Sequence, residues 1–132
     1  NILSIGSKIT LRKISEEIVD KVESINFLDT TTNNFLNWGL SKTKKINYYS
    51  GDITKIDTLI NAGLNDSDII IVHSENDTES LFIAQKSKIN ANSSIFVILE
   101  DLSLAEIFES LGFIIFDSHN LKITRLLNKL GN

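Results

Sequence analysis

The sequence predicts an α/β fold in which a mostly parallel six-stranded sheet carries helices on both faces. Short apolar runs alternate with segments whose apolar residues recur every three or four positions, which indicates strands alternating with amphipathic helices. Residues 69–72, Ile-Ile-Ile-Val, are apolar throughout, as is typical of a central strand buried on both faces. Strict alternation of this kind requires crossover connections, and crossovers join parallel strands.

In the first half of the chain, three predicted strands alternate with three predicted helices. The strands stop at Gly6, at Asp29 and at the pair Ser50-Gly51. The first helix has apolar residues at spacings of three and four, and the third ends near Gly63, which suits a helix C-terminus. The predicted strands are 2–5, 25–28 and 46–49, and the predicted helices are 10–22, 35–40 and 53–60.

The second half repeats the alternation after the central strand. A polar loop over 74–77 precedes one helix, and Gly112 closes the next. The predicted strands are 69–72, 94–99 and 113–116, and the predicted helices are 78–88, 102–111 and 121–130. Because no linker or low-complexity tract interrupts the pattern, we predict one domain over residues 1–132.

Composition excludes several classes of protein. The chain has 132 residues with 13 Lys and Arg against 17 Asp and Glu, so its net charge of −4 excludes an overall basic surface for nucleic acid. No apolar run approaches the ~18 residues of a membrane-spanning helix. Cysteine is absent, which excludes disulfides and thiolate metal sites. Methionine is also absent, and we expect a fragment or a trimmed chain rather than one that begins at its translational start.

The motifs of common catalytic sites are missing. The sequence has no G-x-S-x-G nucleophile motif, no G-x-x-x-x-G-K-[ST] phosphate loop and no pair of histidines at metal-ligand spacing. We therefore predict neither catalytic residues nor a metal site, and expect that the protein is not an enzyme.

Ligands of open parallel sheets bind beyond the carboxyl ends of the strands. The residues that directly follow each predicted strand are therefore the candidates for a binding site. These are Gly6-Ser7-Lys8, Asp29-Thr30, Gly51-Asp52, His73-Ser74-Glu75, Glu100-Asp101 and Asp117-Ser118-His119.

The first turn partly fits a dinucleotide-binding motif, which reads G-x-G-x-x-G with an acidic residue ~20 positions later. Gly6 fills the first glycine position, but Lys8 and Leu11 stand at the other two. Lys8 and Arg12 would supply positive charge beside the phosphate-binding helix N-terminus, and Asp29 would bind a ribose. The alternative is that Asp29 caps the next helix and Lys8 is a solvated lysine.

The other candidates also have two interpretations. Asp52 would accept a hydrogen bond from an adenine amino group, or it caps the helix that follows. His73, in an apolar strand, is more often a packed side chain than a proton-transfer group. We expect His119 to be exposed and identify no partner for it, and we expect the pair Glu100-Asp101 to be a solvated loop. The aromatic residues near Trp38 are core, or an interface if they stay exposed.

A distinctive stretch carries a family resemblance. It runs from Tyr49-Ser50-Gly51-Asp52 through Ala62-Gly63, a short acidic link and the apolar strand 69–72. This stretch resembles the N-terminal lobe of regulator-of-potassium-conductance (RCK, TrkA-N-like) domains. Ile5-Gly6 with Arg12, Asp29, and Leu111-Gly112-Phe113 match further positions of that family.

The resemblance implies a Rossmann-like fold and a regulatory function. It implies a cytosolic domain that binds NAD(H) or an adenine nucleotide (ATP, ADP or AMP) and couples its occupancy to a potassium channel or transporter. The implied partners are a second copy in a homodimer or higher oligomer and a membrane ion-transport subunit, at the inner face of the membrane and without insertion into it. The implied cofactor-binding residues are Gly6, Ser7, Lys8, Arg12, Asp29, Thr30, Gly51, Asp52 and Ser74.

The chain departs from the family at Lys8, at Leu11 and at Ser80, which follows Glu79 where the family often has Asn. These departures keep a second hypothesis open, in which a degenerate module binds no nucleotide and acts by dimerisation or protein interaction. A third hypothesis, an NAD(P)-dependent enzyme, requires a substrate domain for which 132 residues leave no room.

Overall fold

The sheet has the strand order of a doubly wound nucleotide-binding fold. A computed structural model describes residues 1–40 and 45–131. Its six strands are all parallel and follow the order β3-β2-β1-β4-β5-β6, so the chain reverses direction across the sheet between β1 and β4. The strands are β1 (Ile2–Ile5), β2 (Ile25–Asp29), β3 (Ile46–Ser50), β4 (Ile69–Val72), β5 (Ser94–Leu99) and β6 (Ile114–Asp117). The predicted α/β, Rossmann-like fold class is confirmed.

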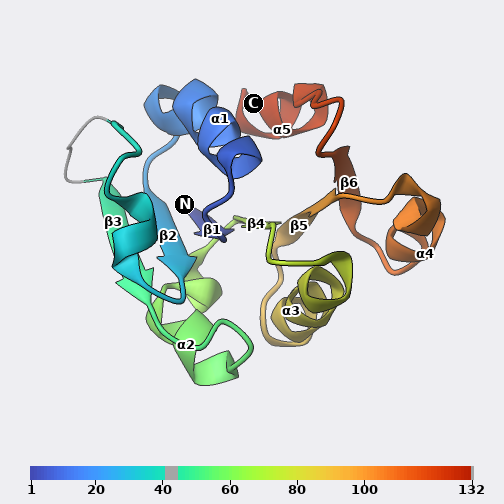
Figure 1. Ribbon diagram of the computed structural model, residues 1–132, viewed down its shortest axis with the longest axis horizontal. Helices are drawn as coiled ribbons and strands as arrows, with labels where there is room; N and C mark the ends of the chain where they lie inside the picture. Colours follow the sequence, from blue (N-terminus) through green and yellow to red (C-terminus); the bar gives the residue numbers. More distant parts are fainter. Residues whose placement is uncertain (41–44, 132) are drawn as a thin grey trace.

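Helices cover both faces of this sheet (Figure 1). α1 and α5 pack on one face, and α2, α3 and α4 on the other. The α-helices are α1 (Ile9–Ile18), α2 (Ile56–Asn61), α3 (Asp77–Asn90), α4 (Ala105–Ser110) and α5 (Thr124–Leu130). Short 3-10 helices are η1 (Val19–Lys21), η2 (Thr32–Phe35), η3 (Leu64–Asp66) and η4 (Leu102–Leu104). No helix among these described residues is long and apolar enough to cross a bilayer.

The central strand β4 explains why two separate cores form. Alternate side chains of a strand point to opposite faces. Ile69 and Ile71 belong to the core under α1 and α5, whereas Ile70 and Val72 belong to the core under α2, α3 and α4. All four residues of β4 are buried, as the uninterrupted apolar run predicts.

The predicted helix over 35–40 is wrong. A 3-10 helix, η2, ends at Phe35, and the Thr31 side chain caps it by accepting a hydrogen bond from the Asn33 amide at 3.2 Å. Phe35 and Trp38 instead pack around Phe27 of β2, with ring centroids 5.8 and 5.2 Å from it. A spacing of three between Phe35 and Trp38 suits an α-helix. The chain buries both side chains against β2 with a 3-10 turn, which is tighter than an α-helix.

Several predicted boundaries also move. The first helix ends at Ile18 and continues only as the 3-10 turn η1, while the third begins at Ile56 because residues 53–55 form a turn. The helix predicted from 102 starts as η4, and the last helix starts at Thr124. Because the neighbouring strands β3, β2, β1 and β4 are parallel, their carboxyl ends lie at one edge of the sheet.

Candidate functional site

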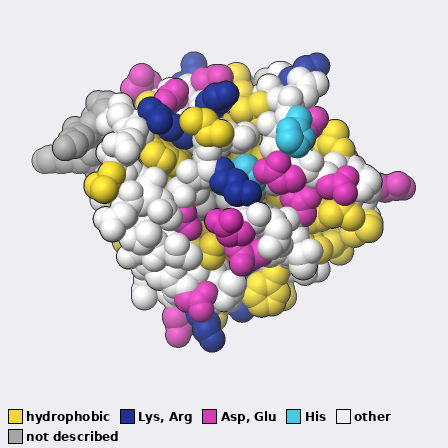
Figure 2. All heavy atoms as spheres, in the orientation of Figure 1, with side chains coloured by type: hydrophobic (Ala, Val, Ile, Leu, Met, Phe, Trp, Pro, Cys, Tyr) yellow, Lys and Arg dark blue, Asp and Glu magenta, His cyan; other side chains and the backbone are white. Residues whose placement is uncertain are grey.

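A hollow of about 150 Å³ lies at the carboxyl ends of β1, β2, β3 and β4. This is the place where parallel sheets of this topology bind ligands, beside the point at which the strand order reverses. The predicted cofactor-binding residues that line it are Gly6, Ser7, Lys8, Asp29, Thr30, Asp52 and Ser74. The other lining residues are Ile53, Thr54, His73, Glu75 and Glu79. In Figure 2, acidic side chains lie to the right of and below a basic one near the middle of this face.

Asp29, at the end of β2, is held by three donors. Its Oδ1 accepts a hydrogen bond from the Thr30 amide at 2.7 Å, and its Oδ2 accepts one from Asn34 Nδ2 at 2.9 Å. The Ser7 hydroxyl from the β1–α1 turn also donates to Oδ2. The structure therefore brings Ser7 and Asp29, which follow different strands, into direct contact. An ionised carboxylate accepts at about four positions, so Asp29 retains capacity for a ligand hydroxyl.

Asp52, after β3, is an exposed acceptor that also lines the hollow. Its Oδ1 accepts from the Thr54 amide at 3.0 Å and from the Thr54 hydroxyl at 2.6 Å. The hydroxyl bond, followed by the amide bond, lowers the pKa of the Asp52 carboxyl. The interpretation of Asp52 as the cap of the following helix is wrong, because Asp52 closes the turn over 53–55 and α2 begins after Lys55 without a side-chain cap.

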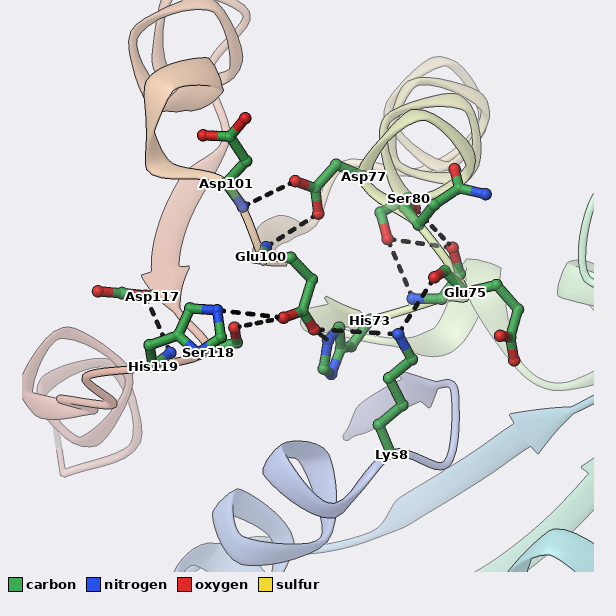
Figure 3. A network of polar contacts seen from close by, with 12 residues as sticks. Lys8, His73, Glu75, Asp77, Ser80, Glu100, Asp101, Asp117, Ser118 and His119 are labelled. Atoms are coloured by element: carbon green, nitrogen blue, oxygen red, sulfur yellow. Dashed lines mark hydrogen bonds and ion pairs between the residues drawn. The ribbon is translucent and has the colours of Figure 1, made fainter.

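Lys8, at the start of α1, points toward Glu75 and Glu100 (Figure 3). Its Nζ donates to the Glu75 carbonyl oxygen at 3.2 Å and lies 3.9 Å from Glu100 Oε1. The side chain thus spans from the β1–α1 turn to the turns after β4 and β5. Of its two predicted roles, a solvated loop lysine describes it poorly, since it has partners on two other loops.

Arg12 and Gly51 are the predicted site residues that do not line the hollow. Arg12 lies one helical turn further along α1, where its Nε forms an ion pair with Glu16 at 3.1 Å. Gly51 directly precedes Asp52, and its backbone packs beside the Thr58 side chain. Their roles in binding stay predictions.

Ser80 stabilises the turn that carries Ser74. The Ser80 hydroxyl accepts a hydrogen bond from the Ser74 amide at 3.0 Å and lies 3.1 Å from the Ser74 hydroxyl. Ser80 is completely buried. Ser80 stands at the position where the resemblance leads one to expect Asn. It holds Ser74, which lines the pocket, without lining the pocket itself.

A polar cluster around Glu100 adjoins the hollow (Figure 3), and the sequence placed its members after strands without indicating that they meet. Glu100 Oε1 lies 2.8 Å from His73 Nε2, while its Oε2 accepts from the Ser118 hydroxyl at 2.8 Å and lies 3.6 Å from His119 Nε2. The expectation that Glu100 is merely solvated is wrong, and Glu100 is the partner that the sequence did not identify for the exposed His119. These residues follow β4, β5 and β6, and that shared placement was the available signal. The prediction that His73 is a packed side chain is confirmed, with 2% of its surface exposed.

The surroundings of His73 and Glu100 shift both pKa values downward. Burial lowers the pKa of the His73 imidazole, which favours the neutral ring. The hydrogen bonds from His73 and then Ser118 lower the pKa of Glu100, which favours the carboxylate. An ionised carboxylate only accepts, so His73 Nε2 carries the proton and donates it. Among the described residues, its buried Nδ1 has no hydrogen-bond partner.

Acidification should destabilise the fold through His73. Its folded pKa lies below the unfolded value near 6.5, so the unfolded chain binds more protons below that pH. The contribution of His73 to the free energy of unfolding is greatest above pH 6.5. It decreases as the pH falls from that value toward the folded pKa. Glu100 contributes in the same direction, but only below its ordinary pKa of 4.5.

Thermal unfolding at pH 8 and pH 5 tests this. We expect His73→Gln to reduce the fall in Tm between these pH values, because glutamine does not titrate. His119→Gln is the matched control, since His119 is exposed. An equal fall in wild type and His73→Gln would contradict the prediction.

Solved structures share this fold at low sequence identity. The TrkA-N domain of the inner membrane protein ybaL from Escherichia coli has a TM-score of 0.76 and 12% identity, and the match covers 100% of this chain and 96% of that one. The Shewanella denitrificans Kef CTD in AMP-bound form has a TM-score of 0.67 and 16% identity, with 99% and 82% coverage. The GsuK channel bound to NAD has a TM-score of 0.71 and 13% identity, with 98% of this chain matching 22% of that one.

These identities establish the fold alone. This chain spans about a fifth of the length of the GsuK channel chain. No curated protein sequence is significantly similar to it. The sequence profile of the TrkA-N domain, however, matches residues 9–119, which include most of the pocket-lining residues and the Glu100 cluster. Since that match covers well over half of the sequence, the chain belongs to the TrkA-N domain family.

Proposed function

We propose that this chain is a regulatory domain of a potassium channel or transporter and binds an adenine nucleotide or NAD(H) in the hollow at the ends of β1 to β4. The observation that carries the proposal is the convergence of Lys8, Asp29 and Asp52 from three strand ends on one pocket at the reversal of strand order. Membership of the TrkA-N family supports the same conclusion.

Each residue has a chemical role in this proposal. The Asp29 carboxylate accepts hydrogen bonds from ribose hydroxyls, as the acidic residue at the end of the second strand does in this type of fold. Asp52 accepts from the adenine amino group across the pocket. Lys8 and the N-terminus of α1 attract the phosphate, because a helix N-terminus carries partial positive charge. Arg12 adds longer-range positive charge from the next turn of α1.

We infer that binding regulates a partner and is not followed by catalysis. The nucleotide shifts an assembly between states only if it binds one state more tightly than the other. In this proposal the domain pairs with a second copy, forms a homodimer or higher oligomer, and lies at the cytoplasmic face of the membrane beside an ion-transporting subunit.

A ligand-free interaction module is the second candidate. The observation that favours it is the Lys8 side chain, which contacts Glu75 and Glu100 at the pocket mouth and stands where a glycine would leave room for a pyrophosphate. Leu11, at the last glycine position of the motif, is fully buried and fills space between α1 and the sheet.

Thermal unfolding with AMP, ADP, ATP, NAD and NADH separates the two candidates. A ligand that binds only the folded state stabilises it by roughly 2.7 kcal/mol at 100 times its Kd. For a chain of this size we expect that stabilisation to raise Tm by about 10 °C. Asp52→Ala should reduce the shift, whereas Asp57→Ala, an exposed acidic residue outside the pocket, should preserve it. No shift with any nucleotide at millimolar concentration would support the ligand-free module.

A further inference from the structure

We propose that the pocket selects an adenine nucleotide with a single phosphate, such as AMP, over dinucleotides and over nucleotides with longer phosphate chains. This inference rests on the proposed function and specifies its ligand. Its two grounds are the contacts that close the second half of the binding crevice and the charge of the half that stays open.

A dinucleotide needs both halves of a doubly wound sheet. One mononucleotide unit lies over β1, β2 and β3, and the other over β4, β5 and β6, with the pyrophosphate between them at the reversal of strand order. The hollow in this protein is lined from the ends of β1 to β4 and by the start of α3. The described residues that follow β5 and β6 do not line it. The open space therefore lies over the first mononucleotide unit and not over the second.

Direct side-chain contacts close the other half. Glu100, after β5, is bound to His73 on one side and to Ser118 on the other, each at 2.8 Å. Asp77 at the start of α3 accepts hydrogen bonds from the Glu100 and Asp101 amides, each at 3.0 Å. These bonds join the turns after β4, β5 and β6, and a second nucleoside would have to separate them (Figure 3).

Lys8 completes the closure at the place where a pyrophosphate would cross. Its Nζ connects the Glu75 carbonyl oxygen, at 3.2 Å, with Glu100 Oε1, at 3.9 Å. The side chain therefore lies between the open and the closed half. A single phosphate at the N-terminus of α1 can approach Lys8 Nζ from the open half. A dinucleotide has to displace Lys8 from both Glu75 and Glu100.

The charge of the open half opposes additional phosphates. Its lining carries the carboxylates of Asp29, Asp52, Glu75 and Glu79, while Lys8 is the one lysine or arginine among the described residues that line it. Each phosphate beyond the first adds negative charge close to these carboxylates, and like charges in a cleft repel. The pocket therefore favours AMP over ADP and ATP, and the Lys8 closure disfavours NAD and NADH.

Titration calorimetry of the protein with AMP, ATP, NAD and NADH tests the proposal. We expect the Kd of AMP to be at least about tenfold lower than that of the other three. Glu100→Gln keeps the shape of the side chain but removes the charge that attracts Lys8. It should therefore reduce the ratio of the Kd of NAD to the Kd of AMP. Lys8→Gly should narrow it further. The matched controls are Glu106→Gln on α4 and Lys13→Ala on α1, both exposed and outside the pocket.

The outcomes are distinguishable. Preference for AMP, with a ratio that narrows in Glu100→Gln and Lys8→Gly but not in the controls, supports the inference. NAD or ATP binding as tightly as AMP overturns the inference and leaves the proposed function standing. A preference for AMP that Glu100→Gln and Lys8→Gly leave unchanged overturns the claim that the contacts of Lys8 and Glu100 exclude the dinucleotides. The absence of binding by every nucleotide overturns the proposed function, and the inference with it.

Discussion

Replacing Gly6 with alanine should lower the free energy of unfolding by about 4 kcal/mol, near the upper end for a single substitution, or prevent folding. Gly6 has a φ of +117°, which L side chains rarely adopt. A Cβ atom there would lie 1.9 Å from the His73 carbonyl oxygen and 2.9 Å from its carbonyl carbon. Both contacts are with backbone, so no side-chain rotation relieves them.

The clash would separate β1 from β4 at the site. The His73 amide donates to the Ile5 carbonyl oxygen at 2.9 Å, and the Gly6 amide donates to the Leu28 carbonyl oxygen at 2.8 Å. These bonds hold the ends of three neighbouring strands together beneath the pocket. Moving Gly6 away from His73 strains both.

Chemical denaturation of Gly6→Ala and Gly39→Ala provides the measurement and its control. Gly39 also has a positive φ, +66°, but the nearest atom to an added Cβ is the end of the Arg12 side chain at 3.9 Å. Gly39→Ala should therefore cost only the backbone strain, about 1–2 kcal/mol. If the two variants lose equal stability, the close approach of Gly6 to His73 is not what requires glycine there.

The sequence predicted the strands better than the helices because burial determines the strands. Ile69 to Val72 are apolar at every position, and only a central strand buries all of them in two cores. The segment after β2 carries an ambiguous signal. A spacing of three between Phe35 and Trp38 is compatible with an α-helix and with a 3-10 turn. What buries them is packing around Phe27, a tertiary contact that local patterning does not reveal.

The pocket was predictable to the extent that it depends on strand ends. Asp29 and Asp52 follow predicted strands, and parallel topology brings such residues to one edge of the sheet. The Glu100 cluster depends instead on side-chain directions in three separate turns. Local patterning assigns Glu100 and His119 to polar loops, and nothing in their neighbouring residues indicates that the two side chains meet.

Replacing Asp29 with alanine should weaken adenine-nucleotide binding by roughly ten- to a hundredfold, because a hydrogen bond to a charged group contributes about 1.5–3 kcal/mol. Its carboxylate, held by the Thr30 amide and Asn34, is directed to the pocket and would accept from a ribose hydroxyl. The substitution also leaves Ser7 without its acceptor. Asn34→Ala, which removes a donor but keeps the carboxylate, is therefore the matched control and should lose much less affinity.

A ligand series separates the ribose contact from a general disturbance of the pocket. In the wild-type protein, AMP should bind more tightly than its 2′-deoxy or its 3′-deoxy analogue, because an analogue that lacks the bonded hydroxyl leaves the Asp29 carboxylate without that donor. In Asp29→Ala this preference should disappear, since the acceptor is already gone, and the two losses should not add. If both analogues lose the same affinity in the variant as in the wild type, a different group binds the ribose. A preference that vanishes only in Asp29→Ala, and persists in Asn34→Ala, would identify this carboxylate as the ribose acceptor.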